Sequence, residues 1–247
     1  MTTKGTCKLC GNFGELQYSH IIPEFLYKPL YDKIHRAIQF RHRNVLNKSY
    51  LQKGVRDWIL CKSCESRVND NIEKPFRAFW TERILKCDIR NNVIIISGNH
   101  DVIKKFILLN LWRASVSNHD IGENAKLGPH EKRIRDIITG NSMAKETDYP
   151  LWGNLLVDEK GVIQVQLITK FARSRPDGHT VFYSAYGGVE WCVKCSSHKW
   201  PKCEAIKLKA DGTLILGRQL AWTSNVIKGF FDSANTQLKR IVPRHGR

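Results

Sequence analysis

Four cysteines in two matching pairs offer the ligands for a metal ion. The pairs are Cys7-x-x-Cys10 and Cys61-x-x-Cys64. Four thiolates with this spacing favour one tetrahedral zinc ion, which would hold two distant segments of the chain together. Two unrelated pairs of free thiols, or a redox-active pair, are the alternatives. Because no strand–helix–strand pattern surrounds the cysteines, we expect structural zinc.

A histidine between the two pairs offers acid–base chemistry. His20 follows Ser19 and precedes Ile21-Ile22-Pro23, where a strand leading from the first cysteine pair would present it. An imidazole that is neutral near pH 7 can remove a proton from water. Taken alone, such a histidine is better explained as a buried residue with a satisfied hydrogen bond. The nearby cysteines favour the functional interpretation.

Hard metal ligands follow the second cysteine pair, in a segment expected to be helical. Glu65 and Asn69 are four residues apart and therefore share one face of a helix. A carboxylate and an amide oxygen suit Mg²⁺ or Mn²⁺. Glu73 extends the same face by one turn. The alternative is a solvated polar face opposite Val68 and Ile72.

These motifs together resemble the HNH endonucleases, whose ββα-metal domain is held by a zinc ion. The resemblance covers about residues 5–75. It implies that His20 is the general base, that Ser19, Glu65 and Asn69 hold a catalytic Mg²⁺ or Mn²⁺ ion, and that the zinc is structural. The residues that carry the resemblance are Cys7-x-x-Cys10, Ser19-His20-Ile21-Ile22-Pro23 and Cys61-x-x-Cys64-Glu65.

Three positions depart from the usual family pattern. Ser19 stands where the family has a carboxylate or an imidazole, and serine is a weaker metal ligand. Glu65 stands where the family has a histidine ligand, for which glutamate is a plausible chemical replacement. The central asparagine of the family, which fixes the loop beside the general base, has no firm match. The spacing points to Arg56 or Asp57, with Asn44 and Asn47 as looser candidates.

The function implied by the resemblance is metal-dependent hydrolysis of phosphodiester bonds, with DNA as the expected substrate. The habits of the family suggest a role in bacterial defence against foreign DNA or in mobile-element biology. The alternative is a non-catalytic, zinc-stapled nucleic-acid-binding protein that has lost the first metal ligand at Ser19. A nuclease needs His20, Glu65 and Asn69 to converge, whereas a binding protein needs only the zinc and a basic surface.

The charge of the chain is independent evidence for a polyanionic partner. Its 247 residues include 40 Lys and Arg against 23 Asp and Glu, which gives a formal charge of +17. Nucleic acid is the expected partner. No apolar stretch is long enough to span a membrane, and Met1 to Gly5 lack the apolar segment of a signal peptide. We therefore expect a cytoplasmic protein without a membrane partner, and a protein partner or homo-oligomer is compatible with the sequence.

A second group of thiols lies near the C-terminus. It is a candidate for a second zinc site, although Cys192 and Cys195 would face opposite sides of a strand unless the strand ends between them. The alternative is a set of incidental thiols in a β-rich region. Cys87 stands alone and is expected to be a small buried residue. The candidate ligands are Cys192, Cys195, His198 and Cys203.

The predicted fold class is α+β, in three regions. Residues 1–74 form the HNH-like ββα-metal domain with its CxxC/CxxC zinc staple, residues 75–145 a helical middle, and residues 146–247 a β-rich C-terminal region. Helices are predicted for Pro23–Ala37, from Ser63 onward with a break, kink or new start at Pro75, Val102–Ser117, Glu131–Thr139 and Asn225–Leu238.

The predicted strands lie mostly in the last third of the chain. Residues Gln39–Lys53 are polar and without period, and are predicted to form a long loop. A hairpin is predicted for Leu155–Val157 with Val162–Ile168, and a second around the turn Asp211-Gly212. The other predicted strands are Trp58–Leu60, Asn92–Ser97, Val181–Tyr186, Val189–Val193, Ala205–Lys209 and Thr213–Leu216.

Overall fold

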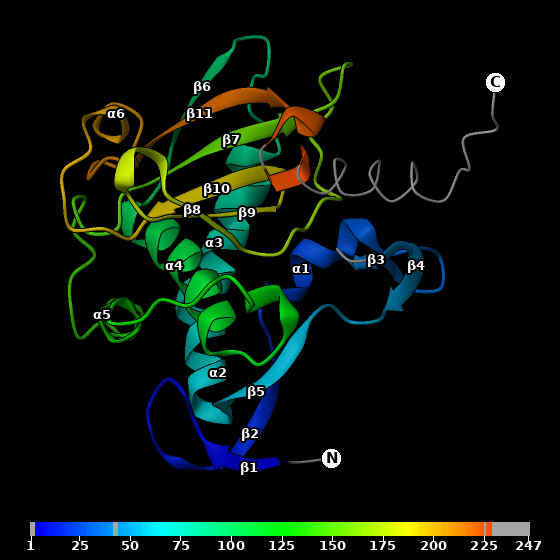
Figure 1. The fold of residues 1–247 in the computed structure, drawn as a ribbon, viewed down its shortest axis with the longest axis vertical. Helices are drawn as coiled ribbons and strands as arrows, with labels where there is room; N and C mark the ends of the chain where they lie inside the picture. Colours follow the sequence, from blue (N-terminus) through cyan, green and yellow to red (C-terminus); the bar gives the residue numbers. More distant parts are fainter. Residues whose placement is uncertain (1–2, 42–43, 225, 229–247) are drawn as a thin grey trace, which may run out of the picture.

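The computed structural model describes residues 3–41, 44–224 and 226–228. Over these residues helices are combined with three β-sheets, so the predicted mixed α and β class is confirmed (Figure 1). One hydrophobic core extends from Cys7 and Leu9 to Leu216, and includes side chains from all three predicted regions. The N-terminal sheet, the helices and the large sheet are therefore packed as one unit.

The N-terminal sheet has the order β1-β2-β5 and is antiparallel throughout. A tight turn joins β1 to β2, closed by the N–H of Gly11 donating to the carbonyl of Cys7 at 2.9 Å. In β2 and β5, Ser19 lies opposite Asp57 and His20 lies opposite Arg56. The predicted strands leading to His20 and to the second cysteine pair are confirmed. The strands are β1 (Thr3–Thr6), β2 (Phe13–His20) and β5 (Arg56–Cys61).

The connection from β2 to β5 differs from the prediction in two places. The helix predicted for Pro23–Ala37 is short, because the carboxylate of Asp32 accepts from the N–H groups of Ile34 and Arg36 and closes a turn instead. The loop predicted for Gln39–Lys53 contains a hairpin. Within the described part of the chain this two-stranded hairpin pairs with no other strand, so its strands do not require the alternation of a half-buried sheet. The elements are α1 (Glu24–Tyr27), η1 (Lys28–Leu30), β3 (Ala37–Arg41) and β4 (Asn44–Leu51).

A helical stretch continues without interruption from Lys62 to Ile84. Pro75 neither breaks it nor starts a separate helix, and the residues that join its segments keep right-handed helical angles. Pro75 has no N–H group for the carbonyl one turn earlier, and a π turn just before it absorbs the mismatch. The stretch crosses the predicted boundary at residue 74. Its segments are α2 (Lys62–Val68), η2 (Asn69–Glu73), α3 (Lys74–Phe79) and η3 (Trp80–Ile84).

Two further helices agree with the prediction. In α4 (His100–Val116), Asn99 caps the N-terminus by accepting from the N–H of Val102 at 3.1 Å. Helix α5 (His130–Thr139) ends at Gly140, whose φ of 83° is the left-handed conformation that favours glycine. Helix α4 is buried on nearly all sides, which explains why its apolar residues extend beyond a single stripe.

The large sheet has the order β6-β11-β7-β10-β9-β8 (Figure 1). Strands β7 and β11 are parallel and the other neighbours are antiparallel. Strand β6 comes from the predicted helical middle, so the sheet crosses the predicted boundary at residue 145. The strands are β6 (Val93–Ser97), β7 (Leu151–Val157), β8 (Ala172–Ser174), β9 (Val181–Tyr186), β10 (Val189–Lys194) and β11 (Thr213–Leu220).

The two predicted C-terminal hairpins form only in part. The end of β7 pairs with the segment after the turn through a bridge between Val157 and Ile163 and through the N–H of Gln164 donating to the carbonyl of Leu156 at 2.8 Å. The rest of β7 has β11 and β10 as neighbours, so the pairing extends no further. The turn at Asp211-Gly212 is present, but β11 then pairs with β6 and β7. Residues Ala205–Lys209 follow the short helix α6 (Pro201–Glu204) as turns.

The helix predicted for Asn225–Leu238 lies outside the described residues except for 226–228.

Candidate functional site

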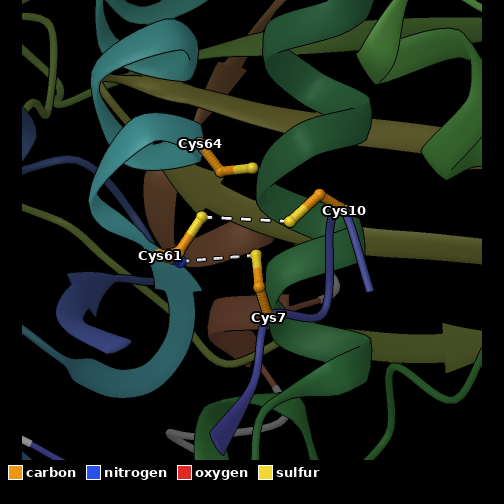
Figure 2. Close-up of side chains that lie close together, drawn as sticks. All are labelled: Cys7, Cys10, Cys61 and Cys64. Carbon is orange, nitrogen blue, oxygen red and sulfur yellow. Dashed lines mark hydrogen bonds between the residues drawn. The ribbon is translucent and has the colours of Figure 1, made fainter. Parts of the chain in front are cut away.

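The two cysteine pairs meet at one point between the N-terminal turn and the start of α2. Their four Sγ atoms all lie within 4.8 Å of one another, and Cys10 and Cys61 are 3.9 Å apart (Figure 2). The backbone N–H of Cys61 donates to the sulfur of Cys7 at 3.3 Å. The four thiols therefore form one cluster rather than two unrelated pairs.

The geometry of this cluster suits zinc. A tetrahedral ion with Zn–S bonds of about 2.3 Å places its sulfurs about 3.8 Å apart, close to the separation of Cys10 and Cys61. Burial raises the pKa of Cys7 and of Cys64, and neighbouring thiols add to the rise at Cys64. A dication would offset this cost by stabilising the thiolates.

The pKa of Cys61 is lowered, in contrast to those of Cys7 and Cys64. Partial burial would raise its pKa, but the Ser63 hydroxyl and the backbone N–H of Cys64 outweigh it, and the pKa falls to about 6. The Ser63 oxygen lies 3.2 Å from the sulfur. Cys61 is therefore largely a thiolate at neutral pH, which is the form that binds a metal ion. The cluster can hold a metal ion such as zinc.

A groove of about 440 Å³ opens between α1 and the helical stretch that begins with α2. Three of the predicted site residues line it: His20 at the end of β2, Glu65 on α2, and Asn69 where η2 begins. Ser19 is only 2% exposed and lies behind the groove wall, where its hydroxyl donates to Oε2 of Glu65 at 2.7 Å. The structure therefore brings the predicted residues together.

The ring of His20 is oriented through its Nε2 atom. This nitrogen lies 2.8 Å from the carbonyl oxygen of Lys53 and 2.5 Å from Oε2 of Glu24. Both partners are hydrogen-bond acceptors, so Nε2 carries a proton and Nδ1 carries the lone pair of the neutral ring. Tyr31 holds the Glu24 carboxylate from the other side by donating to Oε1 at 3.0 Å.

The carbonyl of Lys53 is itself fixed. Nε of Arg56 donates to the same oxygen at 2.8 Å, so Arg56 shares the acceptor of His20. Lys53 and Gly54 both have positive φ, 66° and 69°. A Cβ atom at Gly54 would lie 2.7 Å from the Tyr27 ring and 3.2 Å from the His20 ring, so this turn requires glycine.

The candidates for the central loop-fixing position have separate roles. Arg56 fixes the Lys53 carbonyl beside His20. Asp57 points to the other side, where its Oδ2 accepts from the hydroxyl of Ser117 at 2.9 Å and from the N–H of Asn118 at 2.8 Å. Asp57 therefore ties the sheet to the end of α4. The side chains of Asn44 and Asn47 lie outside the part of the chain that is described.

A buried arginine lies beneath the groove. Arg113 of α4 is 0% exposed; its NH1 lies 2.6 Å from Oε1 of Glu73 and its NH2 lies 3.6 Å from Oε2 of Glu65. This contact was not predicted from the sequence. An arginine inside the apolar run Leu111-Trp112-Arg113-Ala114 was the available signal, because an unpaired buried charge is costly.

The π turn explains how Arg113 reaches both carboxylates. An α-helix has 3.6 residues per turn, so each step of four residues goes slightly beyond a full turn. After two such steps, from Glu65 through Asn69 to Glu73, the last side chain would point to a different side of the helix. A π turn holds more residues, and the N–H of Lys74 donates to the carbonyl of Asn69, five residues earlier. Glu73 is thereby brought back toward the side of Glu65.

The candidate second zinc ligands are not brought together. Cys192 and Cys203 share a small apolar cluster, Cys195 belongs to the main core on the other side of the strand, and His198 is exposed. Burial raises the pKa of Cys195 to about 12 and that of Cys192 as well. Among the described residues, the N-terminal cysteines alone form a group of three or more close metal ligands. Cys87 is half-buried, in partial agreement with the prediction.

In the described part of the chain, no helix is both long and apolar enough to cross a membrane.

Comparison of the chain with protein-family models, curated proteins and solved structures gives no match. The geometry of the site therefore carries the functional argument.

Proposed function

We propose that this protein is a metal-dependent endonuclease of the HNH type that hydrolyses phosphodiester bonds in DNA. The observation that carries the proposal is the convergence of His20, Glu65 and Asn69 on one groove beside a four-cysteine cluster. An imidazole, a carboxylate and an amide are the groups that water activation and a hard metal ion require. The formal charge of +17 supports a polyanionic substrate.

His20 acts as the general base. The carbonyl of Lys53 holds the proton on Nε2, so Nδ1 is the atom that accepts a proton from the attacking water. Glu24 faces the same ring and stabilises the imidazolium that forms. Both groups keep the ring in one orientation during the reaction.

Glu65, Asn69 and Ser19 would hold the divalent ion. The Ser19 hydroxyl lies 2.7 Å from Glu65 Oε2, near the roughly 2.9 Å that separates adjacent ligands of an octahedral Mg²⁺ ion. Once bound, the ion would stabilise the negative charge that develops on the phosphate and the leaving oxygen. Arg113 balances the charge of Glu73, so the two glutamates do not repel each other across the groove floor.

One observation favours the alternative of a non-catalytic nucleic-acid-binding protein. Oε2 of Glu65 accepts from Ser19 and also faces NH2 of Arg113, so the atom that would bind a divalent ion already has two partners. On this alternative, the same contacts hold the helix to the sheet. The zinc cluster and the basic charge then account for the whole function.

Plasmid nicking by the purified full-length protein tests the proposal. We expect cutting with Mg²⁺ or Mn²⁺, none with EDTA, and a loss of about 10²- to 10⁴-fold in His20→Ala. The matched control is His198→Ala, because His198 is exposed and not among the groove-lining residues. Zinc content and melting temperature show that both variants are folded. Equal cutting by His20→Ala and the parent protein would refute the assignment, and binding without cutting would favour the alternative.

A further inference from the structure

The sheet face that carries His20 also carries an aromatic pair, of which Tyr18 is exposed. Tyr18 lies directly opposite Trp58, and His20 lies directly opposite Arg56. Directly opposed residues of an antiparallel pair point to the same side, and so do residues two apart along one strand. All four side chains therefore share one face, while Ser19 and Asp57 occupy the other.

Three of these side chains, those of Trp58, Tyr18 and Arg56, lie in a row. The ring centroids of Tyr18 and Trp58 are 5.0 Å apart, and the guanidinium carbon of Arg56 lies 5.7 Å from the centroid of Tyr18. Trp58 packs partly against the core beneath. Tyr18 remains 51% exposed, so much of its surface is open to solvent.

The row lies within reach of the nucleic-acid strand whose cleavage His20 would catalyse as a general base. Residues two apart on a β-strand are separated by about 6.8 Å, which is about two base rises of 3.4 Å in duplex DNA and fewer in an unstacked, more extended strand. A ring at Tyr18 is thus one or two nucleotides from a phosphate held at His20. Arg56 adds positive charge between these two positions, which complements the phosphate backbone.

We propose that Tyr18, supported by Trp58 and Arg56, is a stacking platform for an unpaired base next to the cleaved phosphate. The inference rests on the proposed function and specifies its substrate class as nucleic acid with at least one unstacked base. Exposed aromatic rings beside arginine bind unpaired bases through their π faces, whereas bases inside a duplex are already stacked.

Binding of labelled oligothymidine, measured by fluorescence anisotropy without added divalent ion, tests the platform. We expect Tyr18→Leu to weaken binding by about 5- to 100-fold, because stacking on one aromatic ring contributes this much per base. Tyr18→Phe keeps the π face and should bind like the parent protein. The matched control is Phe13→Leu, since Phe13 is a 74% exposed aromatic residue at the far end of the same strand.

Duplex DNA of the same length provides the second arm of the experiment. Its affinity should not change in Tyr18→Leu, because paired bases do not reach the platform. Unchanged oligothymidine binding by Tyr18→Leu would overturn the proposal. Equal losses on single-stranded and duplex DNA, with a lowered melting temperature, would also overturn it, because the pair would then serve only the sheet.

The two proposals fail separately. A protein that binds through Tyr18 but never cuts retains the platform and refutes the nuclease. A protein that nicks plasmids while Tyr18→Leu binds oligothymidine normally retains the nuclease and refutes the platform.

Discussion

At the scale of single residues, the main chain rather than another side chain sets the proton position on His20. The carbonyl of Lys53 accepts from Nε2, and it is available because Lys53 and Gly54 both adopt positive φ. A side chain at Gly54 would press against both the Tyr27 ring and the His20 ring. The geometry of the base therefore depends on a residue that performs no chemistry.

Gly54→Ala should lower both stability and cutting. The substitution combines backbone strain at positive φ with the contacts to Tyr27 and His20, and we expect a loss of about 2–4 kcal/mol in unfolding free energy. Urea unfolding and plasmid nicking measure the two effects. Gly140→Ala is the matched control, because Gly140 also has positive φ but has open space around its Cβ position. Equal losses in the two variants would show that strain alone acts at Gly54.

At the scale of elements, an internal ion pair joins α4 to the helical stretch that lines the groove. Arg113→Met should destabilise the fold by about 3–5 kcal/mol, because Glu73 is then left without its buried cation. Urea unfolding gives the value, and the double variant with Glu73→Gln should recover part of it.

Lys74→Met is the control on the same stretch. Lys74 makes an exposed ion pair with Asp70, so its loss should cost less than about 1 kcal/mol. A comparable cost for Arg113→Met would show that the buried pair contributes no more than a surface one.

The cysteine cluster links the first turn of the chain to the start of α2. We expect the purified protein to contain zinc bound at this cluster, and expect Cys10→Ser to lose it and to melt at a lower temperature. Elemental analysis and thermal melting provide the measurements. Cys87→Ser should keep the metal, because Cys87 lies outside the cluster. Zinc retained in Cys10→Ser at the parent level would contradict the assignment.

At the scale of the whole molecule, the unfolding free energy should change with pH in the alkaline range, because one lysine ammonium group is buried. Lys104 is 1% exposed and donates to the carbonyls of Lys145 and Glu146. Burial lowers its pKa to about 8, against the opposing effect of Asp148 and Glu146 and with a small contribution from Lys207. The folded protein therefore releases this proton before the unfolded chain does.

Because the folded protein loses the Lys104 proton at a lower pH than the unfolded chain does, the direction of the change in unfolding free energy can be stated. Below pH 8 both states are protonated and the cost of burial is fully present. Between about pH 8 and 10.5 the unfolded chain binds more protons, so the unfolding free energy should rise with pH, by up to about 3 kcal/mol. Urea unfolding of the parent and Lys104→Met, compared across this range, isolates the contribution. A difference between the two proteins that stays constant with pH would show that the pKa of Lys104 is the same in the folded and unfolded states.

The sequence was sufficient for features that depend on local spacing. The two cysteine pairs, the strand ending at His20 and the shared helix face of Glu65 and Asn69 all follow from short-range periodicity. The strands that neighbour β7 in the large sheet could not be predicted in this way, because they come from distant parts of the sequence. The contact of Arg113 with Glu73 likewise depends on how α4 crosses the helical stretch and on a π turn that the sequence signals only weakly.

The order of strands in the large sheet also determines when, during translation, the sheet can be completed. Among the described strands, β6 lies at the edge and pairs with β11 alone, joining Val93 to Gly217 and Ser97 to Thr213. At translation rates of about 5–20 residues per second, β11 is made roughly 6 to 25 seconds after β6. Every other strand of the sheet is synthesised in that interval. A ribosome that stalls before Thr213 therefore leaves Ile94 and Ile96 without the strand that completes their burial.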